Sequence, residues 1–588
     1  MLAPRGAKVH NAAKESSGAV SFMDLYSLIT SLIGQGSRRG ALMISLSCTH
    51  PDLEEFIALK SDLGKCTAAN ISVRITDEFM KAVKNDEWFT LSFTRKETGE
   101  TIKKVVNAHE IFRKMCEMNW DYAEPGMLFW DRIESWNLLS EDPNFEYAGT
   151  NPCAEEPLPA GGSCLLGSLN LAEFVNPDKT FNFDKFRDAV DIAVDALNDV
   201  LDEGLPLHPL EEQRESVKNW RQIGLGIMGL ADMLLKMGIR YGSPEAIKLC
   251  DEIGNEMAKE AINCSTDMAA EYGLPYPMFE RECVAKSPFY QTHTSFDRGS
   301  AYTLYNSQLL TIAPTGTIST MLGISGGIEP IYANSYTRKT ESLHGHDEYY
   351  KIYTPIVEQY MKEHGLTDES QLPDYFVTAQ DIPYKERIDM QAAWQNHIDA
   401  SISSTINLPH DTTVEEVESL YMYAWEKGLK GVTIFRDGCK RAGILTTDKP
   451  EEKKEASAAD SQEAPDETAL PRGYIVKADD SSIGKKRTLT TGCGTLHCVA
   501  MFDEETGELF ETYLSKGSSG GCNNFMIGLS RMISLSARGG VDIYSIVDQL
   551  KSCGVCPSYA VRSATKHDIS KGSCCPMAIG NALLDMYQ

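Results

Sequence analysis

Short apolar strands alternate with amphipathic helices along about the first 445 residues, and this alternation constrains the fold more than any other feature. The segments 40–47 (GALMISLS), 309–312 and 430–435 (KGVTIF) predict strands. Residues 51–60 predict a helix with acidic residues in its first turn, and apolar residues recur at helical spacing over 186–201. The alternation predicts an α/β fold with a mostly parallel sheet, either open or closed as a barrel.

The composition changes abruptly near residue 447. The segment that follows has almost no large apolar residues and is rich in charges, Ala, Ser and Pro. Such a segment cannot bury enough surface to offset its ordering entropy, so it predicts a flexible linker. We therefore predict a first domain at residues 1–446, a linker at 447–485 and a second domain at 486–588, which carries seven of the sixteen cysteines.

The net charge of −28 argues against nucleic acid as a partner, because an acidic surface repels phosphate backbones. No apolar run reaches the roughly 18 residues that span a bilayer, so no membrane partner is expected. The first ten residues, MLAPRGAKVH, lack the apolar core of a secretory signal. Scattered cysteines without such a signal predict mostly reduced thiols and a cytoplasmic location.

The first motif with chemical potential is Asn151-Pro152-Cys153-Ala154-Glu155, followed eleven residues later by Cys164. The prolines at 152 and 157 exclude a regular helix, so the motif predicts a loop. One interpretation is a buried cysteine beside an exposed glutamate. Another is a site for covalent or redox chemistry, because a thiol, a carboxylate and a second thiol lie close in sequence. A Cys–His hydrolase is less favoured, since no histidine is near in sequence.

The second motif is a strand that runs into a turn and then a possible helix. Glycine in the turn lets a ligand approach the backbone, and N–H groups at a helix start bind anions. The motif predicts either a phosphate site or an ordinary helix cap, and no Walker-type lysine follows to indicate an NTPase. Its candidate ligand-binding residues are Pro314, Thr315, Gly316, Thr317 and Ile318.

Two further patterns have competing interpretations. Gly224, Gly226 and Gly229 form a literal G-x-G-x-x-G, but a charged helical pattern precedes them where a dinucleotide site needs a strand. We therefore predict glycines that permit close helix packing. In the last 100 residues or so, four cysteines could form a zinc site, a redox dithiol or a metal-free thiol-rich core. These zinc candidates are Cys553, Cys556, Cys574 and Cys575.

Taken together, NPCAE with GGSC, IAPTGTIS with SGGIEP, STINLP and KGVTIFRDG resemble, in this order and spacing, the adenosylcobalamin-dependent (class II) ribonucleotide reductases. The last block resembles the TSCPD-type accessory domain attached to many of them. The resemblance implies a ten-stranded α/β barrel with a finger loop inside it, followed by a small α+β domain. It also implies reduction of ribonucleotides to deoxyribonucleotides for DNA synthesis, with adenosylcobalamin as the cofactor.

The resemblance also implies a role for each site residue. Cys153 would be the thiyl radical that abstracts the 3′-hydrogen, Glu155 the general base for the 3′-hydroxyl, and Asn151 a substrate ligand. Cys164 would be one of the two thiols that reduce the intermediate. Pro152 and Ala154 would complete the loop around the substrate, and residues 314–318 would bind its phosphates through backbone N–H groups.

Partners follow from the resemblance as well. Residues 5–18 and 61–70 align with loops that bind deoxynucleotide or ATP effectors at a homodimer interface, where the predicted helix at 21–33 would pack. A thioredoxin-like protein would reduce the active-site thiols. The first barrel strand of the family, with the partner thiol of Cys164, has no counterpart in this sequence. The alternative is therefore a non-catalytic or split nucleotide-binding subunit that needs a second chain for that strand and cysteine.

Overall fold

The computed structural model describes residues 2–8, 14–33, 40–62, 64–95, 98–294, 302–341, 347–440, 482–504, 506–516 and 523–587. The chain divides into two compact units, Met1–Glu452 and Lys453–Gln588. Residues 447–481 of the predicted linker lie outside the described residues, and its last four residues begin strand β15 (Ser482–Thr491). None of the described helices is long and apolar enough to cross a membrane.

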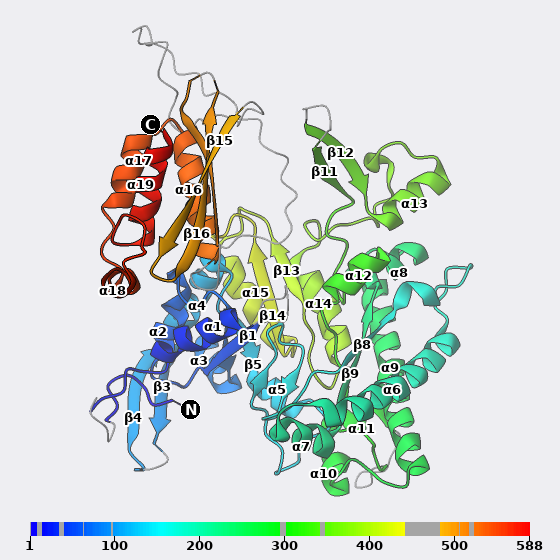
Figure 1. Cartoon of the computed structure of the whole chain (residues 1–588). Coiled ribbons are helices and arrows are strands. Elements are labelled where there is room, and N and C mark those ends of the chain that lie inside the picture. Colours follow the sequence, from blue (N-terminus) through cyan, green and yellow to red (C-terminus); the bar gives the residue numbers. More distant parts are fainter. Residues whose placement is uncertain are drawn as a thin grey trace. The chain divides into compact units, whose positions relative to one another are not determined.

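Two main sheets form the centre of the first unit (Figure 1). The larger has the strand order β1-β2-β5-β14-β13 and the smaller has the order β10-β9-β8. Neighbouring strands are parallel, except that β14 runs antiparallel to β5. The predicted α/β class is therefore confirmed. The strands are β1 (Leu42–Ser47), β2 (Ala69–Ile75), β5 (Gly126–Phe129), β8 (Leu166–Asn170), β9 (Gln222–Met228), β10 (Gln308–Leu310), β13 (Thr405–Leu408) and β14 (Gly431–Arg436).

The segment that leads into β13 joins the two sheets. Ile312, just after β10, forms a parallel bridge with Ile402. The N–H of Ile312 donates to the carbonyl of Ser401 (3.1 Å), and the carbonyl of Ile312 accepts from the N–H of Ser403 (2.9 Å). The strands therefore form one continuous array from β1 to β8. Within the described ranges no strand pairs with the outer edge of either β1 or β8, and a ten-stranded closed barrel remains a prediction.

Amphipathic helices pack against these strands and bury the apolar faces of both. Helix α6 (Phe183–Gly204) shows how the sequence directs this packing. Asn182 caps it by accepting the N–H of Lys185 (3.0 Å), and its buried side chains recur at helical spacing. Helix α6 contacts β8, β9 and helix α9. The buried apolar residues on its core face are Phe186, Val190, Val194, Leu197 and Leu201.

The remaining helices of the first unit are α1 (Met23–Leu32), α2 (Leu53–Ala58), α3 (Asp77–Lys84), α4 (Ala108–Tyr122), α5 (Trp130–Ser135), α7 (Glu211–Trp220), α8 (Leu230–Met237), α9 (Pro244–Glu271), α10 (Arg281–Lys286), α11 (Pro288–His293), α12 (Gly316–Leu322), α13 (Pro355–His364), α14 (Tyr384–Gln395) and α15 (Val414–Glu426). Antiparallel hairpins are β3 (Trp88–Thr94) with β4 (Thr101–Asn107), β6 (Gly149–Thr150) with β7 (Pro157–Leu158), and β11 (Ser335–Glu341) with β12 (Asp347–Tyr353).

The glycine motif at 224–229 differs from the prediction of close helix packing. The charged run before it is helix α7, which Arg221 ends in a left-handed conformation (φ 44°), and the motif then forms the fully buried strand β9. A Cβ atom built on Gly226 would lie 2.1 Å from the carbonyl oxygen of Thr311 on the neighbouring strand segment. The glycine is therefore required because two strands approach closely, not because helices do.

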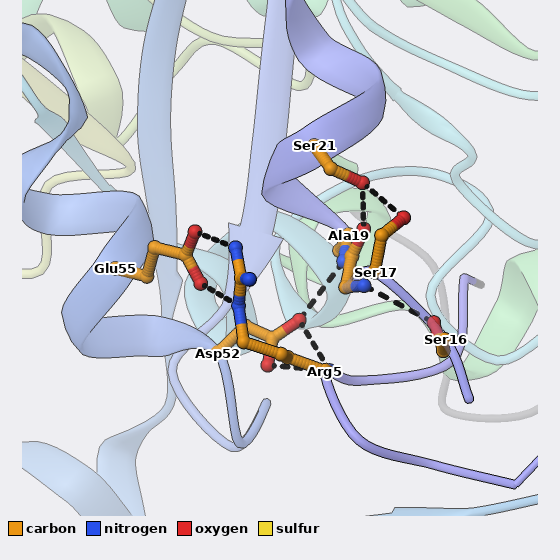
Figure 2. A network of polar contacts seen from close by, with 8 residues as sticks. Arg5, Ser16, Ser17, Ala19, Ser21, Asp52 and Glu55 are labelled. Carbon is orange, nitrogen blue, oxygen red and sulfur yellow. Dashed lines mark hydrogen bonds and ion pairs between the residues drawn. The ribbon is translucent and has the colours of Figure 1, made fainter.

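The N-terminal segment is held against helix α2 by one carboxylate (Figure 2). Asp52 accepts the backbone N–H of Arg5 (3.0 Å to Oδ1) and that of Ala19 (2.9 Å to Oδ2). The guanidinium of Arg5 also donates to Glu55 (2.9 Å). Asp52 is only 7% exposed, so these bonds fix the two ends of the segment 5–19 at one place on the unit.

The second unit is an antiparallel sheet followed by helices, an α+β arrangement. Strands β15 (Ser482–Thr491), β16 (Gly494–Asp503) and β17 (Leu509–Lys516) lie in that order, and the helices are α16 (Asn523–Arg538), α17 (Ile543–Lys551), α18 (Pro557–Lys566) and α19 (Cys575–Tyr587). Ser534 of α16 accepts the N–H of Thr512 (2.9 Å), and Ser530 accepts that of Leu514 (3.1 Å). The helix thereby protects the outer edge of β17.

Candidate active site

The NPCAE motif forms the turn of the hairpin β6–β7, as its prolines predict. The backbone N–H of Asn151 donates to the carbonyl of Glu156 (3.1 Å), and the Asn151 side chain accepts the N–H of Glu156 (3.1 Å). Ala154 adopts a left-handed conformation (φ 66°). These bonds close a tight loop and present the residues between Asn151 and Glu156 at its tip.

Both sheets hold the tip of this loop. From β2, the side chain of Asn70 donates to the carbonyl of Pro152 (3.1 Å). On the opposite side, the carbonyl of Glu155 accepts the hydroxyl of Thr311 (2.7 Å) and the N–H of Ser401 (3.0 Å). The loop therefore lies between the two sheets, fixed at each by backbone hydrogen bonds.

Cys153 faces a cavity beside the larger sheet. Its side chain is accessible from this cavity, yet enough protein surrounds it that burial, and secondarily the charge of Glu155, raises the pKa of its thiol to about 11. At neutral pH it is a thiol and not a thiolate, which disfavours a nucleophile and suits a donor of hydrogen atoms. The cavity is also lined by Asn70, Ser72, Gly126, Leu128, Ile402, Ser404, Val432 and Thr433.

Glu155 is 2% exposed, contrary to the interpretation of an exposed glutamate. Burial raises the pKa of its carboxyl, and a hydrogen bond from the side chain of Asn151 partly offsets this effect. Its Oε2 atom is buried with no hydrogen-bond partner among the described residues. A buried carboxyl with a free oxygen can accept a proton from a group that enters the site.

Cys164 lies just before strand β8 and its side chain is accessible. Burial, then the charges of Glu156, Glu155 and Cys153, raises the pKa of its thiol to about 12. Three residues of the loop act on this one thiol. Both predicted cysteines and the predicted carboxyl of Glu155 are therefore close together. Like Cys153, Cys164 is a neutral thiol at physiological pH.

Residues 314–318 form the turn into helix α12. Thr315 is left-handed (φ 50°) and its hydroxyl accepts the N–H of Gly327 (2.8 Å). The first N–H to donate within the helix belongs to Ser319 (2.9 Å, to Thr315), so those of residues 316–318 precede the helical ladder. No atom lies within 4 Å of a Cβ built on Gly316, so the turn is open to a ligand. Thr311 ties this strand end to Glu155.

The sequence did not reveal four residues that build the site. Thr311 and Ser401 bind the carbonyl of Glu155, Asn70 binds that of Pro152, and the backbone of Glu156 closes the loop on Asn151. Thr311 and Glu156 border predicted motifs, so adjacency was an available signal. Asn70 and Ser401 lie far from them in sequence. Asn70 ends the segment 61–70, which the resemblance assigned to an effector, and no local pattern marks Ser401.

Four cysteines of the second unit, Cys493, Cys556, Cys574 and Cys575, lie near one another, and Cys493 lies at the tip of the β15–β16 hairpin. The charges of Cys493, Cys556 and Cys574 all contribute, after burial, to the raised pKa of Cys575. Cys493 was not among the predicted zinc candidates. Across the described residues, no three His, Cys, Asp or Glu side chains form a group that could hold a metal ion. The zinc site thus gains no support from the structure.

The fold and site together define an α/β protein with an interior site of neutral thiols and a buried carboxyl on a loop between two sheets. A family model described as ribonucleotide reductase, barrel domain, matches residues 1–435, and one described as TSCPD domain matches residues 472–587. Because the first match covers most of the chain, this protein belongs to the ribonucleotide reductase family.

Curated relatives carry related names. The chain is 34% identical over 478 residues to the vitamin B12-dependent ribonucleoside-diphosphate reductase of Thermoplasma acidophilum, a match that covers 77% of this chain and 59% of the relative. It is 32% identical to the enzyme of that name from Mycobacterium tuberculosis (76% and 64% covered). It is 28% identical to the vitamin B12-dependent ribonucleotide reductase of Rhodopirellula baltica (91% and 58% covered). The chain spans about three fifths of the length of these relatives.

Proposed function

We propose that this protein reduces ribonucleotides to 2′-deoxyribonucleotides by a thiyl-radical mechanism that depends on adenosylcobalamin. One observation carries the proposal: the loop between the two sheets presents Cys153 as a neutral, cavity-facing thiol next to the buried carboxyl of Glu155. The names of the curated relatives support the choice of reaction and cofactor.

The residue types suit this chemistry. Adenosylcobalamin, when bound, supplies a radical through cleavage of its cobalt–carbon bond. Cys153 fits such a cofactor, because a thiol that keeps its proton at neutral pH can donate a hydrogen atom from the cavity. As a thiyl radical Cys153 takes the 3′-hydrogen of the ribose, and Glu155 accepts the 3′-hydroxyl proton. Asn151 orients the substrate, and Pro152 and Ala154 line its pocket.

The substrate phosphates bind at the turn of residues 314–318 in this proposal. The backbone N–H groups of residues 316–318 precede the hydrogen-bond ladder of helix α12, and the space above Gly316 is open. Because the chain carries a net charge of −28, a phosphate needs such local donors to overcome general repulsion. The hydrogen bond from Thr311 to Glu155 links this turn to the catalytic loop.

Reduction of the intermediate consumes two thiols, of which Cys164 is one. We assign its re-reduction to a thioredoxin-like dithiol protein. Effector nucleotides, either deoxynucleotides or ATP, bind to the segments 5–18 and 61–70 in this scheme. A homodimer would cover helix α1, whose exposed apolar residues support such an interface; these are Leu25, Leu28, Ile29 and Leu32.

A split or non-catalytic nucleotide-binding subunit is the second candidate. The outer edges of β1 and β8 favour it, because no strand pairs with either edge in the part of the chain that the structure describes. Unpaired edges attract another strand, which a second chain could supply together with the partner thiol of Cys164. Deoxynucleotide binding without turnover, followed by turnover when such a chain is added, would distinguish this candidate.

The substitution Cys153→Ala tests the main proposal. The chain is incubated with adenosylcobalamin, a dithiol and each ribonucleoside di- or triphosphate, and deoxynucleotides are separated by chromatography. We expect the variant to form no product while substrate affinity, measured by calorimetry, changes little, because the thiol acts in chemistry and not in binding. The wild type should also show an electron-paramagnetic signal coupled to cobalt, and the variant should not.

Cys283→Ala is the matched control, since Cys283 lies in helix α10 at the outside of the unit and is only partly buried. It should retain wild-type turnover. Product formation by Cys153→Ala at the wild-type rate would refute the radical assignment.

A further inference from the structure

Glu156 is a buried acid that the proposed mechanism leaves unused. Its side chain is 1% exposed, and its Oε2 atom accepts a hydrogen bond from the amide of Gln308 (2.7 Å). Gln308 in turn accepts from the amide of Gln222 (3.2 Å). Among the described residues no cation forms an ion pair with Glu156. The hydrogen-bonded series Gln222, Gln308 and Glu156 therefore contains only neutral donors.

The second carboxyl oxygen of Glu156, Oε1, is buried and has no hydrogen-bond partner within the described ranges. It lies where Gly224 lacks a side chain, since a Cβ atom built on that glycine would be 2.4 Å from it. The fold therefore buries one oxygen of this acid without a hydrogen-bond partner, in a tightly packed position that only a glycine at 224 permits. An unsatisfied buried polar atom is costly, which points to a function for it.

Strand β8, which begins two residues after Cys164, passes this oxygen. Gly224 donates its N–H to the carbonyl of Leu165 (2.9 Å), the residue after Cys164, and Gly224 is paired in register with Leu166. Glu156 Oε1 is thus placed against the backbone that immediately follows the thiol. No hydrogen bond joins Oε1 to the sulfur in this conformation, so contact requires the thiol to turn towards it or one water molecule to bridge them.

The electrostatics agree with this placement. Burial raises the pKa of Glu156 well above its ordinary value, which favours the protonated carboxyl. After burial, Glu156 is the largest cause of the raised pKa of Cys164. If Glu156 and Cys164 both lost their protons, the two negative charges would repel each other. The pair therefore holds at least one proton. A thiolate that forms at Cys164 therefore has a proton source beside it.

We propose that Glu156 is the proton donor to the sulfur of Cys164 when a disulfide containing Cys164 is reduced. A thiolate of the incoming dithiol attacks the other sulfur of that disulfide, the S–S bond breaks, and its electron pair goes to Cys164. The proton of Glu156 then passes to that sulfur, which leaves a Cys164 thiol and a Glu156 carboxylate. The dithiol supplies both electrons, and Glu156 regains its proton from water. This inference rests on the proposed function for one statement only, that Cys164 ends in a disulfide.

The first test measures alkylation of the full chain by iodoacetamide between about pH 7 and 10, with the Cys164 and Cys153 peptides quantified by mass spectrometry. In Glu156→Gln no carboxylate can form beside Cys164, so its pKa should fall and its alkylation near pH 9 should be faster, about tenfold for each pKa unit removed. Cys153 is the internal reference. A Cys164 profile that matches the wild type would overturn the proposal.

The second test follows release of glutathione from a mixed disulfide at Cys164 by dithiothreitol at about pH 7. We expect Glu156→Gln to slow release about 100-fold or more, because a positioned general acid typically contributes about 10²–10⁴-fold. Gln308→Leu, which frees the Glu156 side chain, should slow it less. Glu146→Gln, an exposed acid near the hairpin, should match the wild type. Equal rates in wild type and Glu156→Gln would refute the proton transfer.

Neither measurement uses a nucleotide or a cobalamin. A slowed Glu156→Gln in a chain that forms no deoxynucleotide would support the proton donor while refuting the reductase proposal. Normal glutathione release in Glu156→Gln, in a chain that does form deoxynucleotide, would refute the donor alone.

Discussion

The Nε2 atom of His293 lies 2.8 Å from the Nδ1 atom of His397 in the interior of the first unit. The other ring nitrogen of His293 faces the carbonyl of Phe289 (2.8 Å), which can only accept a hydrogen bond from it. His397 Nε2 faces Asp251 (2.9 Å). The pair joins helices α9 and α11 to the segment that continues to Ser401, which binds the carbonyl of Glu155.

This pair predicts a loss of stability in acid. Burial lowers the pKa of His293 to about 4 and also lowers that of His397, which Asp251 partly counteracts and Lys259 reinforces. Below the unfolded value of about 6.5 the unfolded chain binds more protons than the folded one. The free energy of unfolding should therefore be unaffected above that pH, and His293 should remove about 3 kcal/mol as the pH falls towards 4.

Urea unfolding followed by tryptophan fluorescence measures this effect for the first unit, because all seven tryptophans lie there. The asparagine variant His293→Asn cannot titrate, so its stability should fall less steeply with acid than that of the wild type. The exposed His109 provides the control His109→Asn. Parallel pH curves for His293→Asn and wild type would contradict the prediction.

Two strands approach each other closely at Gly226. One added methyl group there should therefore lower the free energy of unfolding strongly. In Gly226→Ala the new Cβ would lie 2.1 Å from the carbonyl oxygen of Thr311. The strands must separate, which should cost about 3 kcal/mol or more and displace the hydroxyl that binds Glu155. Urea unfolding tests this, with Gly204→Ala as the control because nothing lies within 4 Å of its Cβ. Equal stability of the two variants would disprove the steric argument.

The sequence predicted local elements well and long-range contacts poorly. The apolar runs at 40–47 and 430–435 are strands β1 and β14, and the prolines at 152 and 157 correctly predicted a loop. Strand β9 was missed because a charged helix precedes it directly and its glycines suggested helix packing. Its neighbour on β10, which explains those glycines, is more than eighty residues away.

The candidate site shows the same division. Residue types alone indicated Cys153, Glu155 and Cys164, since a thiol pair with a carboxyl suits redox chemistry. Their surroundings could not be predicted, because Asn70 is 82 residues from Pro152 and Thr311 is 156 residues from Glu155. No local sequence pattern indicates which distant side chain donates a hydrogen bond to a given carbonyl. Burial, which keeps both thiols protonated, depends on the same distant contacts.

Removal of the Asp52 carboxylate should open the N-terminal segment selectively. Asp52→Ala removes the acceptor of the Arg5 and Ala19 N–H groups, which should destabilise the docked segment by about 2 kcal/mol. Hydrogen–deuterium exchange at these two amides should become at least about tenfold faster, while strand β2 stays protected. Glu55→Ala is the control, because its ion pair with Arg5 is exposed and should matter little. Unchanged exchange in Asp52→Ala would contradict the role of this carboxylate.

The two thiols of the site should be separable by the step at which each substitution stops the reaction. Cys153 starts the radical chemistry in our proposal, whereas Cys164 supplies reducing equivalents later. Cys164→Ser should therefore still exchange the 3′-hydrogen of the substrate with solvent, or release its base, but yield no deoxynucleotide. The hydroxyl of serine keeps the size of the side chain and cannot form a disulfide, so folding should be preserved.

Tritium release from 3′-labelled ribonucleotide and chromatography of the products measure the two steps, in the completed enzyme if a second chain proves necessary. Deoxynucleotide at the wild-type yield from Cys164→Ser would mean that another thiol is the reductant, and loss of exchange as well would mean that Cys164 acts before the radical reaches the sugar.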